Sequence, residues 1–182
     1  MGKTGKRTKN KRTKNKMDKN KTGKRTKNKM DKMDKMDKTG KRTKNNRLYE
    51  ETDDYWSIES VKSQPHILYL FSDNDKDKNT SIPGGNQAVI RGEKNAYGIR
   101  TGYSGGFQGG YRDDMLSLNK KMINSDLSSL KKISKKYKKV KYSSQGFGTG
   151  IFNLPDIAPL TYKYLYDKLW GIGIQPSKAV KP

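Results

Sequence analysis

Residues 67–71 read Ile-Leu-Tyr-Leu-Phe, and the polar residues 72–75, Ser-Asp-Asn-Asp, follow them directly. An apolar run this short, bounded by Pro65, is typical of a central strand that is covered on both faces. Strands of that kind belong to α/β sheets, whose ligands bind beyond the carboxyl ends of the strands. Asp73 and Asn74 are therefore candidate ligand-binding residues.

Further elements follow along the chain. Residues 88–91 and 96–100 are predicted strands with a four-residue connection, for which a hairpin is the simplest interpretation. Helical spacing of apolar residues extends over residues 114–137 and from about 156 to 170, with a short strand at 140–142 between them. This order predicts a single small α/β domain with a mixed sheet flanked by helices.

A glycine-rich loop separates the last predicted strand from the last predicted helix. Residues 146–155 read Gly-Phe-Gly-Thr-Gly-Ile-Phe-Asn-Leu-Pro. Three glycines in five positions let the backbone take positive φ and approach a ligand closely. Backbone N–H groups gathered at the start of a helix suit a phosphate. A tight turn that merely packs strand against helix remains the alternative.

Charge divides the chain into two parts. Residues 1–47 hold 21 Lys or Arg against four Asp, a net charge of +17 out of the total of +23. Lys-Arg-Thr-Lys-Asn occurs four times there, and methionine is the only apolar residue type. Such a segment has nothing to bury, so we predict a disordered Lys-rich repeat tail. It could bind nucleic acid non-specifically, or it could be a low-complexity extension without a role.

The rest of the chain is predicted to hold a linker at 48–64, the α/β domain at 65–172 and a C-terminal tail at 173–182. The chain has no Cys and a single His, which excludes disulfides and the common zinc sites. We therefore expect neither a metal nor a cofactor.

No apolar run is long enough for a membrane span or a signal peptide, so we expect a soluble, intracellular protein that is not secreted and has no membrane partner.

Two other loops contain candidate residues. Asn86, in the turn-rich segment 81–87, either offers its amide to a ligand or caps the turn. Residues 101–111 hold five glycines and three aromatics. They form either a lid whose tyrosines stack on a base or sugar, or a flexible surface loop.

Catalytic residues are scarce. No Ser-His-Asp or Cys-His set can be assembled, and the single histidine, His66, lies before the first predicted strand. An enzyme would need Asp73 as a base beside the electrostatic cradle of the glycine loop. Whether the chain is an enzyme or a binding module stays open.

The glycine loop also carries a resemblance. Residues 148–152, Gly-Thr-Gly-Ile-Phe, with Pro155 after them, resemble the second phosphate-binding loop of macro domains, which holds the diphosphate of ADP-ribose. The first macro-domain loop is matched only by Gly84-Gly85-Asn86 and Ala88, and the Asn-Ala-Ala-Asn segment is absent. The resemblance implies that the N–H groups of Thr149, Gly150 and Ile151 bind phosphate and that Phe152 packs on the distal ribose.

Residues 66–170 as a whole resemble a group of small uncharacterised proteins from large phages, giant viruses and bacteria. The shared phrases include Leu68–Asn74, Ala88–Gly92, Asn95-Ala96 and the Ala-Pro-x-Thr-Tyr of residues 158–162. This second resemblance covers the predicted domain and implies no activity.

Together these features predict binding of a nucleotide-type, phosphate-bearing ligand such as ADP-ribose. The alternative is a nucleic-acid-associated or virion structural protein that acts through its basic N-terminal arm. The candidate ligand-binding residues are Asp73, Asn74, Asn86, Gly148, Thr149, Gly150, Ile151 and Phe152.

Overall fold

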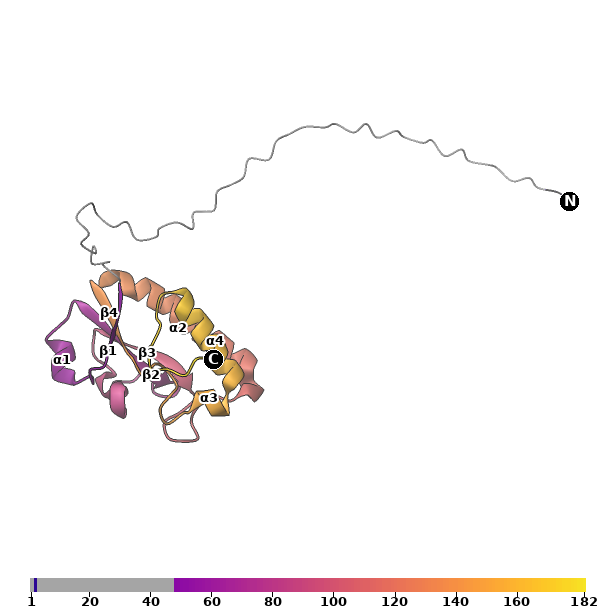
Figure 1. The fold of residues 1–182 in the computed structure, drawn as a ribbon, viewed down its shortest axis with the longest axis horizontal. Coiled ribbons are helices and arrows are strands. Elements are labelled where there is room, and N and C mark those ends of the chain that lie inside the picture. The colour runs from indigo at the N-terminus through magenta and orange to yellow at the C-terminus, as the bar shows by residue number, and fades with distance from the viewer. Residues whose placement is uncertain (1, 3–47) are drawn as a thin grey trace, which may run out of the picture. The chain divides into compact units, whose positions relative to one another are not determined.

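The computed structural model describes residue 2 and residues 48–182 (Figure 1). The predicted disordered repeat tail, residues 1–47, lies outside the described residues except for Gly2.

The domain is built on one four-stranded sheet. Its strands are β1 (Tyr49–Thr52), β2 (Ile67–Asn74), β3 (Ala96–Gly102) and β4 (Lys139–Ser143), in the spatial order β1-β4-β2-β3. All three strand pairs are parallel. The predicted α/β fold is therefore confirmed, whereas the predicted mixed sheet is wrong.

Helices cover both faces of the sheet (Figure 1). One face carries α2 and α4, and the opposite face carries α1 and the short 3-10 helix η1. The bounds are α1 (Ile58–Lys62), η1 (Asn86–Ile90), η2 (Asp113–Met115), α2 (Leu116–Ile133), η3 (Ser134–Lys136), α3 (Leu154–Ile157) and α4 (Pro159–Gly171).

Strand β2 contributes to two hydrophobic cores because its side chains alternate between the faces of the sheet. Leu68 and Leu70 belong to the larger core, with residues of α2 and α4. Ile67, Tyr69 and Phe71 belong to the smaller core, with residues of α1 and η1. The predicted strand covered on both faces is thus confirmed.

The predicted hairpin is wrong. Parallel pairing of β2 and β3 requires a crossover connection, and residues 86–90 supply it as the helix η1. Arg91, which follows η1, turns its guanidinium inward to the Asp73 carboxylate at the end of β2, with an Nη2–Oδ1 distance of 2.6 Å. This pair holds the segment against a face of the sheet, where it cannot join the strand ladder.

Both segments that were expected to flank the domain belong to it. Residues 48–64 form β1 and α1, and Trp56 packs its ring on Tyr69 with the centroids 5.0 Å apart. In the segment 173–182, Ile174 is fully buried. The Lys178 N–H donates to the Ser144 carbonyl at 3.0 Å, so the C-terminal segment packs at the end of β4.

Alkaline pH is expected to destabilise this fold. Burial raises the pKa of several tyrosines, and it raises the pKa of Tyr97 to about 12. The unfolded chain loses these protons near pH 10 while the folded chain keeps them, so this stability is present below about pH 10 and is lost as the pH rises through the folded values. The other tyrosines are Tyr69, Tyr103, Tyr111, Tyr162 and Tyr166.

Urea unfolding midpoints measured from about pH 8 to about pH 11 will test this expectation. The midpoint should fall steadily above about pH 10. The fall should be smaller for Tyr97→Phe, because this variant lacks one of the buried hydroxyls that titrate. The control is Tyr55→Phe, because Tyr55 is 81% exposed and should leave the profile unchanged. A flat profile would contradict the expectation.

Candidate functional site

The glycine loop lies at the carboxyl edge of the sheet, where it follows β4. Because β4 pairs with β2, the loop starts beside the end of β2 that carries Asp73 and Asn74. One direct contact joins them, since the Gly148 N–H donates to Ser72 Oγ at 3.2 Å. The structure thus brings the glycine loop and the end of β2 together at one edge.

Four consecutive backbone N–H groups of this loop have no acceptor among the described residues. Those of residues 149–152 donate no hydrogen bond to any part of the chain that the structure describes. The amides on either side are used, because the Gly148 N–H donates to Ser72 Oγ and the Asn153 N–H donates to the Gly150 carbonyl at 2.9 Å. The loop therefore offers a short row of free donors.

The fold requires glycine at two of the three glycine positions of the loop and does not require it at the third. A Cβ on Gly146 would lie 2.1 Å from the Tyr166 hydroxyl, and one on Gly148 would lie 2.6 Å from Leu154 Cδ1. Both residues also have positive φ, 82° and 74°. Gly150 differs, because its φ is not positive and a Cβ there would meet nothing within 4 Å. Packing explains the first two glycines and leaves Gly150 unexplained.

The side chains of the loop point in two directions. Ile151 is 45% exposed, whereas Phe152 is only 8% exposed and belongs to the larger core. Phe152 lies against Gly102 and Gly110, where a Cβ would approach it to 3.0 Å. The resemblance to macro domains implied that Phe152 packs on a ribose. The structure instead packs it into the larger core, against the two glycines at the ends of the loop that follows β3.

That neighbouring loop exposes one aromatic residue. Tyr103 donates its hydroxyl to Asn119 Oδ1 at 2.6 Å and packs its ring edge-on against Tyr111, with the centroids 4.9 Å apart. These contacts hold both tyrosines against the domain, so they are not free to stack on a ligand. Phe107, at 81% exposure, is the aromatic residue that this loop presents to solvent.

Asp73 is held in a buried ion pair. Its side chain is 1% exposed, and Oδ1 accepts hydrogen bonds from Arg91 Nε at 3.0 Å and Nη2 at 2.6 Å. The Asn74 N–H donates to the same oxygen at 2.8 Å. The Asp73 carboxylate is thus buried and engaged by donors of the protein itself, and it serves the fold as the partner of Arg91.

The two asparagines differ in their freedom. Asn74 is buried, and its side chain closes a turn by donating to Asp77 Oδ2 at 2.9 Å and accepting from the Asp77 N–H at 3.0 Å. Asn86 is exposed and begins η1 with a φ of 50°. Only Asn86 has a side chain that could turn toward a ligand without breaking a contact in the described part of the chain.

The amino end of the last long helix is already occupied. Asp113 accepts the N–H groups of Leu160 and Thr161, at 2.9 Å and 2.8 Å, and so caps α4. The glycine loop leads first into α3, a single turn of four residues. The expectation that a helix end assists phosphate binding is therefore not supported, and the free amides of the loop remain.

A network of buried charges closes the free edge of β3, and the sequence analysis missed it. Asp126 on α2 accepts the backbone N–H of Arg100 at 2.8 Å and the Arg100 guanidinium at 2.8 Å. Lys78 reaches the same carboxylate at 3.1 Å and donates to the Gly98 carbonyl. Burial lowers the pKa of Lys78, although Asp126 opposes this effect.

A sequence signal for this network exists. Asp126 is the one acidic residue of α2, and it falls on the apolar stripe, three residues after Ile123 and four before Leu130. A lone carboxylate among core positions requires a buried partner. The sequence does not say which basic residue provides it, because Arg100 and Lys78 come from distant segments.

The described residues offer no candidate metal site and no candidate membrane span. They contain no group of three or more His, Cys, Asp or Glu side chains that could hold a metal ion. None of their helices combines the length and the apolar character that crossing a membrane requires.

Comparison with known proteins identifies a family. Residues 51–168 match the model of a family of unknown function (DUF7831), and this protein belongs to that family. The match begins within β1 and ends within α4, so it includes all of β2, β3 and β4 and the second half of β1. No match to this chain was found among curated proteins or among solved structures.

Proposed function

We propose that this protein binds a phosphate-bearing ligand of the nucleotide type, such as ADP-ribose, at the glycine loop. The observation that carries the proposal is the row of four free N–H groups at residues 149–152, at the carboxyl edge of a parallel sheet. Successive backbone N–H groups in a turn form concave anion sites, and open α/β sheets bind ligands at this edge.

Gly150 supports the proposal independently. The fold does not need a glycine there, because a Cβ would enter open space. A residue without a side chain does, however, let a ligand reach the backbone closely. A phosphate that accepts from the neighbouring amides could approach through this open space.

The surroundings of the loop suit the remainder of a nucleotide. Phe107 is 81% exposed on the loop that follows β3, and Ile151 is 45% exposed on the glycine loop. The two loops are in contact, because Phe152 of the glycine loop packs against Gly102 and Gly110. An exposed aromatic face stacks on any nucleobase. The proposed site therefore combines amides for a phosphate with apolar side chains for a base or sugar.

The proposal is for binding, not for turnover. Asp73 was the base that the sequence offered, and Arg91 holds it in a buried pair. The macro-domain resemblance of residues 148–152 supports ADP-ribose as the first probe among phosphate-bearing ligands.

Thermal unfolding of the full chain with ADP-ribose, ADP or inorganic pyrophosphate will test the site. A ligand at about a hundred times its Kd stabilises the folded state by about 2.7 kcal/mol, which raises the melting temperature by several degrees. We expect at least one probe to do so. Gly150→Glu should abolish the shift, because it places a carboxylate beside the free amides without meeting any protein atom within 4 Å at its Cβ.

Two variants control for this result. Gly150→Ala adds an uncharged methyl group in open space and should reduce the shift less than Gly150→Glu does. Gly171→Glu adds the same charge at an exposed glycine at the end of α4, where a Cβ also meets nothing, and should respond like the wild type. If no probe shifts the wild type, or if Gly150→Glu responds fully, the proposed site is wrong.

A further inference from the structure

A dense run of lysines lies at the amino edge of the sheet, opposite the glycine loop. Residues 131–141 contain seven lysines and no acidic residue. They cover the last turn of α2, the helix η3 and the first half of β4. We call the five that are exposed the lysine patch, namely Lys131, Lys132, Lys135, Lys136 and Lys138.

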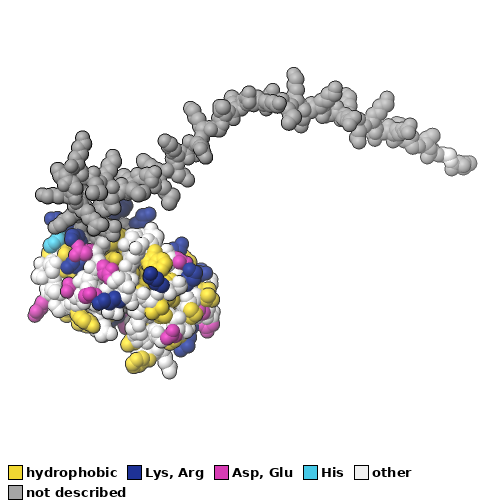
Figure 2. All heavy atoms as spheres, in the orientation of Figure 1, with side chains coloured by type: hydrophobic (Ala, Val, Ile, Leu, Met, Phe, Trp, Pro, Cys, Tyr) yellow, Lys and Arg dark blue, Asp and Glu magenta, His cyan; other side chains and the backbone are white. Residues whose placement is uncertain are grey.

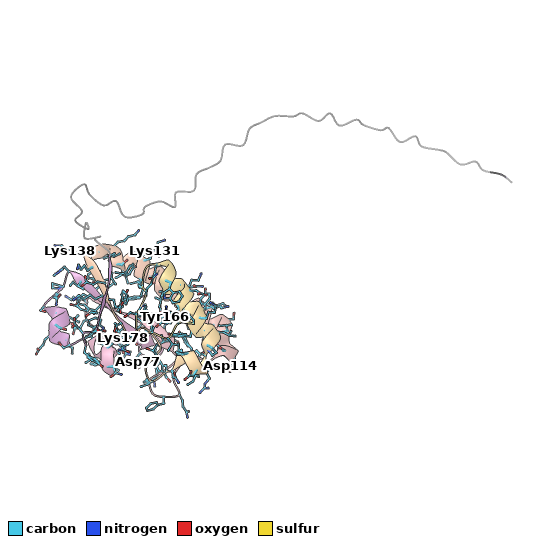
Figure 3. All side chains as sticks on the ribbon, in the orientation of Figure 1. Asp77, Asp114, Lys131, Lys138, Tyr166 and Lys178 are labelled. Atoms are coloured by element: carbon cyan, nitrogen blue, oxygen red, sulfur yellow. The ribbon has the colours of Figure 1, made fainter. Side chains whose placement is uncertain are left out.

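The patch lies where the chain enters the domain. Leu48 directly precedes β1, and its carbonyl accepts the N–H of Val140 in β4 at 2.7 Å. Lys138 stands two residues before Val140, so it belongs to the same edge. Figure 3 shows Lys131 and Lys138 at one end of the domain, away from Asp77 and Asp114, and Figure 2 shows several Lys and Arg side chains along that upper edge.

The charge of the patch is not compensated within the domain. Lys139 pairs with Glu50, but none of the five patch lysines forms an ion pair with a described residue. Lys131 and Lys132 lie in the last turn of α2, where a positive charge interacts favourably with the helix dipole. This interaction explains the presence of two of the five lysines. Like charges spaced four residues apart, as in Lys131 and Lys135, repel by a few tenths of a kcal/mol. If these lysines were only solvated, their clustering would cost repulsion energy and would bring no compensating interaction.

We infer that the lysine patch binds the phosphate backbone of nucleic acid. Clustered lysines that displace counterions from a polyanion recover the cost of their mutual repulsion. Residues 1–47 have a net charge of +17, so the full chain attracts a polyanion more strongly than the patch alone would. The binding is independent of base sequence because lysine contacts to phosphate carry no sequence information.

An anionic membrane is the less suitable partner. Membrane surface binding combines basic charge with apolar side chains that insert between the lipids. The strongly exposed apolar residues Tyr55, Ile82 and Phe107 lie on the loops after β1, β2 and β3, at the opposite edge from the patch. The three most exposed apolar side chains are thus separated from the patch, and Trp170 at the end of α4 is only 36% exposed.

Lysine acetylation footprinting on the full chain, with and without a short DNA duplex, tests the inference directly. The duplex should slow acetylation of the patch lysines several-fold. It should not protect Lys76, Lys121 or Lys163, which are exposed elsewhere. Protection of residues 1–47 alone would overturn the inference. Protection of the patch by phosphatidylserine vesicles and not by DNA would also overturn it.

A matched pair of variants separates the patch from net charge. One replaces Lys131, Lys132, Lys135 and Lys136 by Gln, and the other replaces Lys76, Lys121, Lys163 and Lys181 by Gln, so each lowers the net charge of +23 by four. The slope of log affinity against log salt should become shallower by about 3 to 4 for the first variant and by less than about 1 for the second. Equal changes in the two variants would overturn the inference. The ligand assay at Gly150 is unaffected by either outcome.

Discussion

Replacing Asp126 by Asn is expected to lower the free energy of unfolding by about 3–5 kcal/mol, because it removes the buried anion that Lys78 and Arg100 share. The Asp126 side chain is 1% exposed, and it contacts Lys78 at 3.1 Å and Arg100 at 2.8 Å. Asn retains the shape and one acceptor oxygen but removes the negative charge. Arg100 would keep its pair with Asp75 at 2.7 Å, whereas Lys78, whose side chain is 16% exposed, would lose its ion-pair partner with little solvent to screen its charge.

Equilibrium unfolding in urea at neutral pH measures this loss. The matched control is Asp167→Asn, which removes a carboxylate from an exposed pair with Lys163 at 3.4 Å on the surface of α4. That variant should change stability by less than about 0.5 kcal/mol, since exposed pairs four residues apart contribute little. A loss below about 1 kcal/mol for Asp126→Asn would show that the network contributes little to stability.

Gly98→Ala is expected to be nearly as damaging, by about 3 kcal/mol or more, although it adds a single methyl group. A Cβ on Gly98 would lie 2.3 Å from Asp73 Oδ2 and 2.6 Å from Asp73 Cβ. Gly98 is on β3, which pairs with β2, so the backbone cannot move away without breaking the ladder. The new methyl group must therefore displace the buried pair of Asp73 and Arg91.

The same unfolding measurement applies, with Gly150→Ala as the control. Both changes convert Gly to Ala, and neither glycine has a positive φ, so backbone strain does not distinguish them. They differ in the space around the Cβ, which is filled at position 98 and open at position 150. Gly150→Ala should unfold like the wild type. Equal stability of the two variants would contradict the packing argument.

Local pattern predicted much of this fold. The run at 67–71 predicted the buried central strand, and the helical spacing at 114–137 predicted α2 with its short extensions. The strand β1 was missed because its sequence, Tyr-Glu-Glu-Thr, carries charge and has no apolar alternation. Residues 88–91 were read as a strand because Ala-Val-Ile-Arg is strand-like by composition. In the structure residues 86–90 form η1, and Arg91 after them is held by its long-range hydrogen bond to Asp73.

The candidate site was predictable to a similar extent. Chain order placed the glycine loop and the end of β2 at one edge, because parallel strands present their carboxyl ends together. The sequence pattern does not reveal which polar groups at this edge are available to a ligand, because that depends on hydrogen bonds to distant residues. Asp73 is held by a residue 18 positions away, and the amino end of α4 is capped by Asp113, nearly fifty positions earlier.

The closed edge of β3 also limits how copies of this chain can associate. An edge strand normally offers its backbone groups to a strand from another molecule. Here Asp126 already accepts the Arg100 N–H, and Lys78 donates to the Gly98 carbonyl. An incoming strand would have to expel both side chains and separate their buried charges. Growth of the sheet into a dimer or a fibril is therefore disfavoured on this side, and self-association there has to use side-chain surfaces.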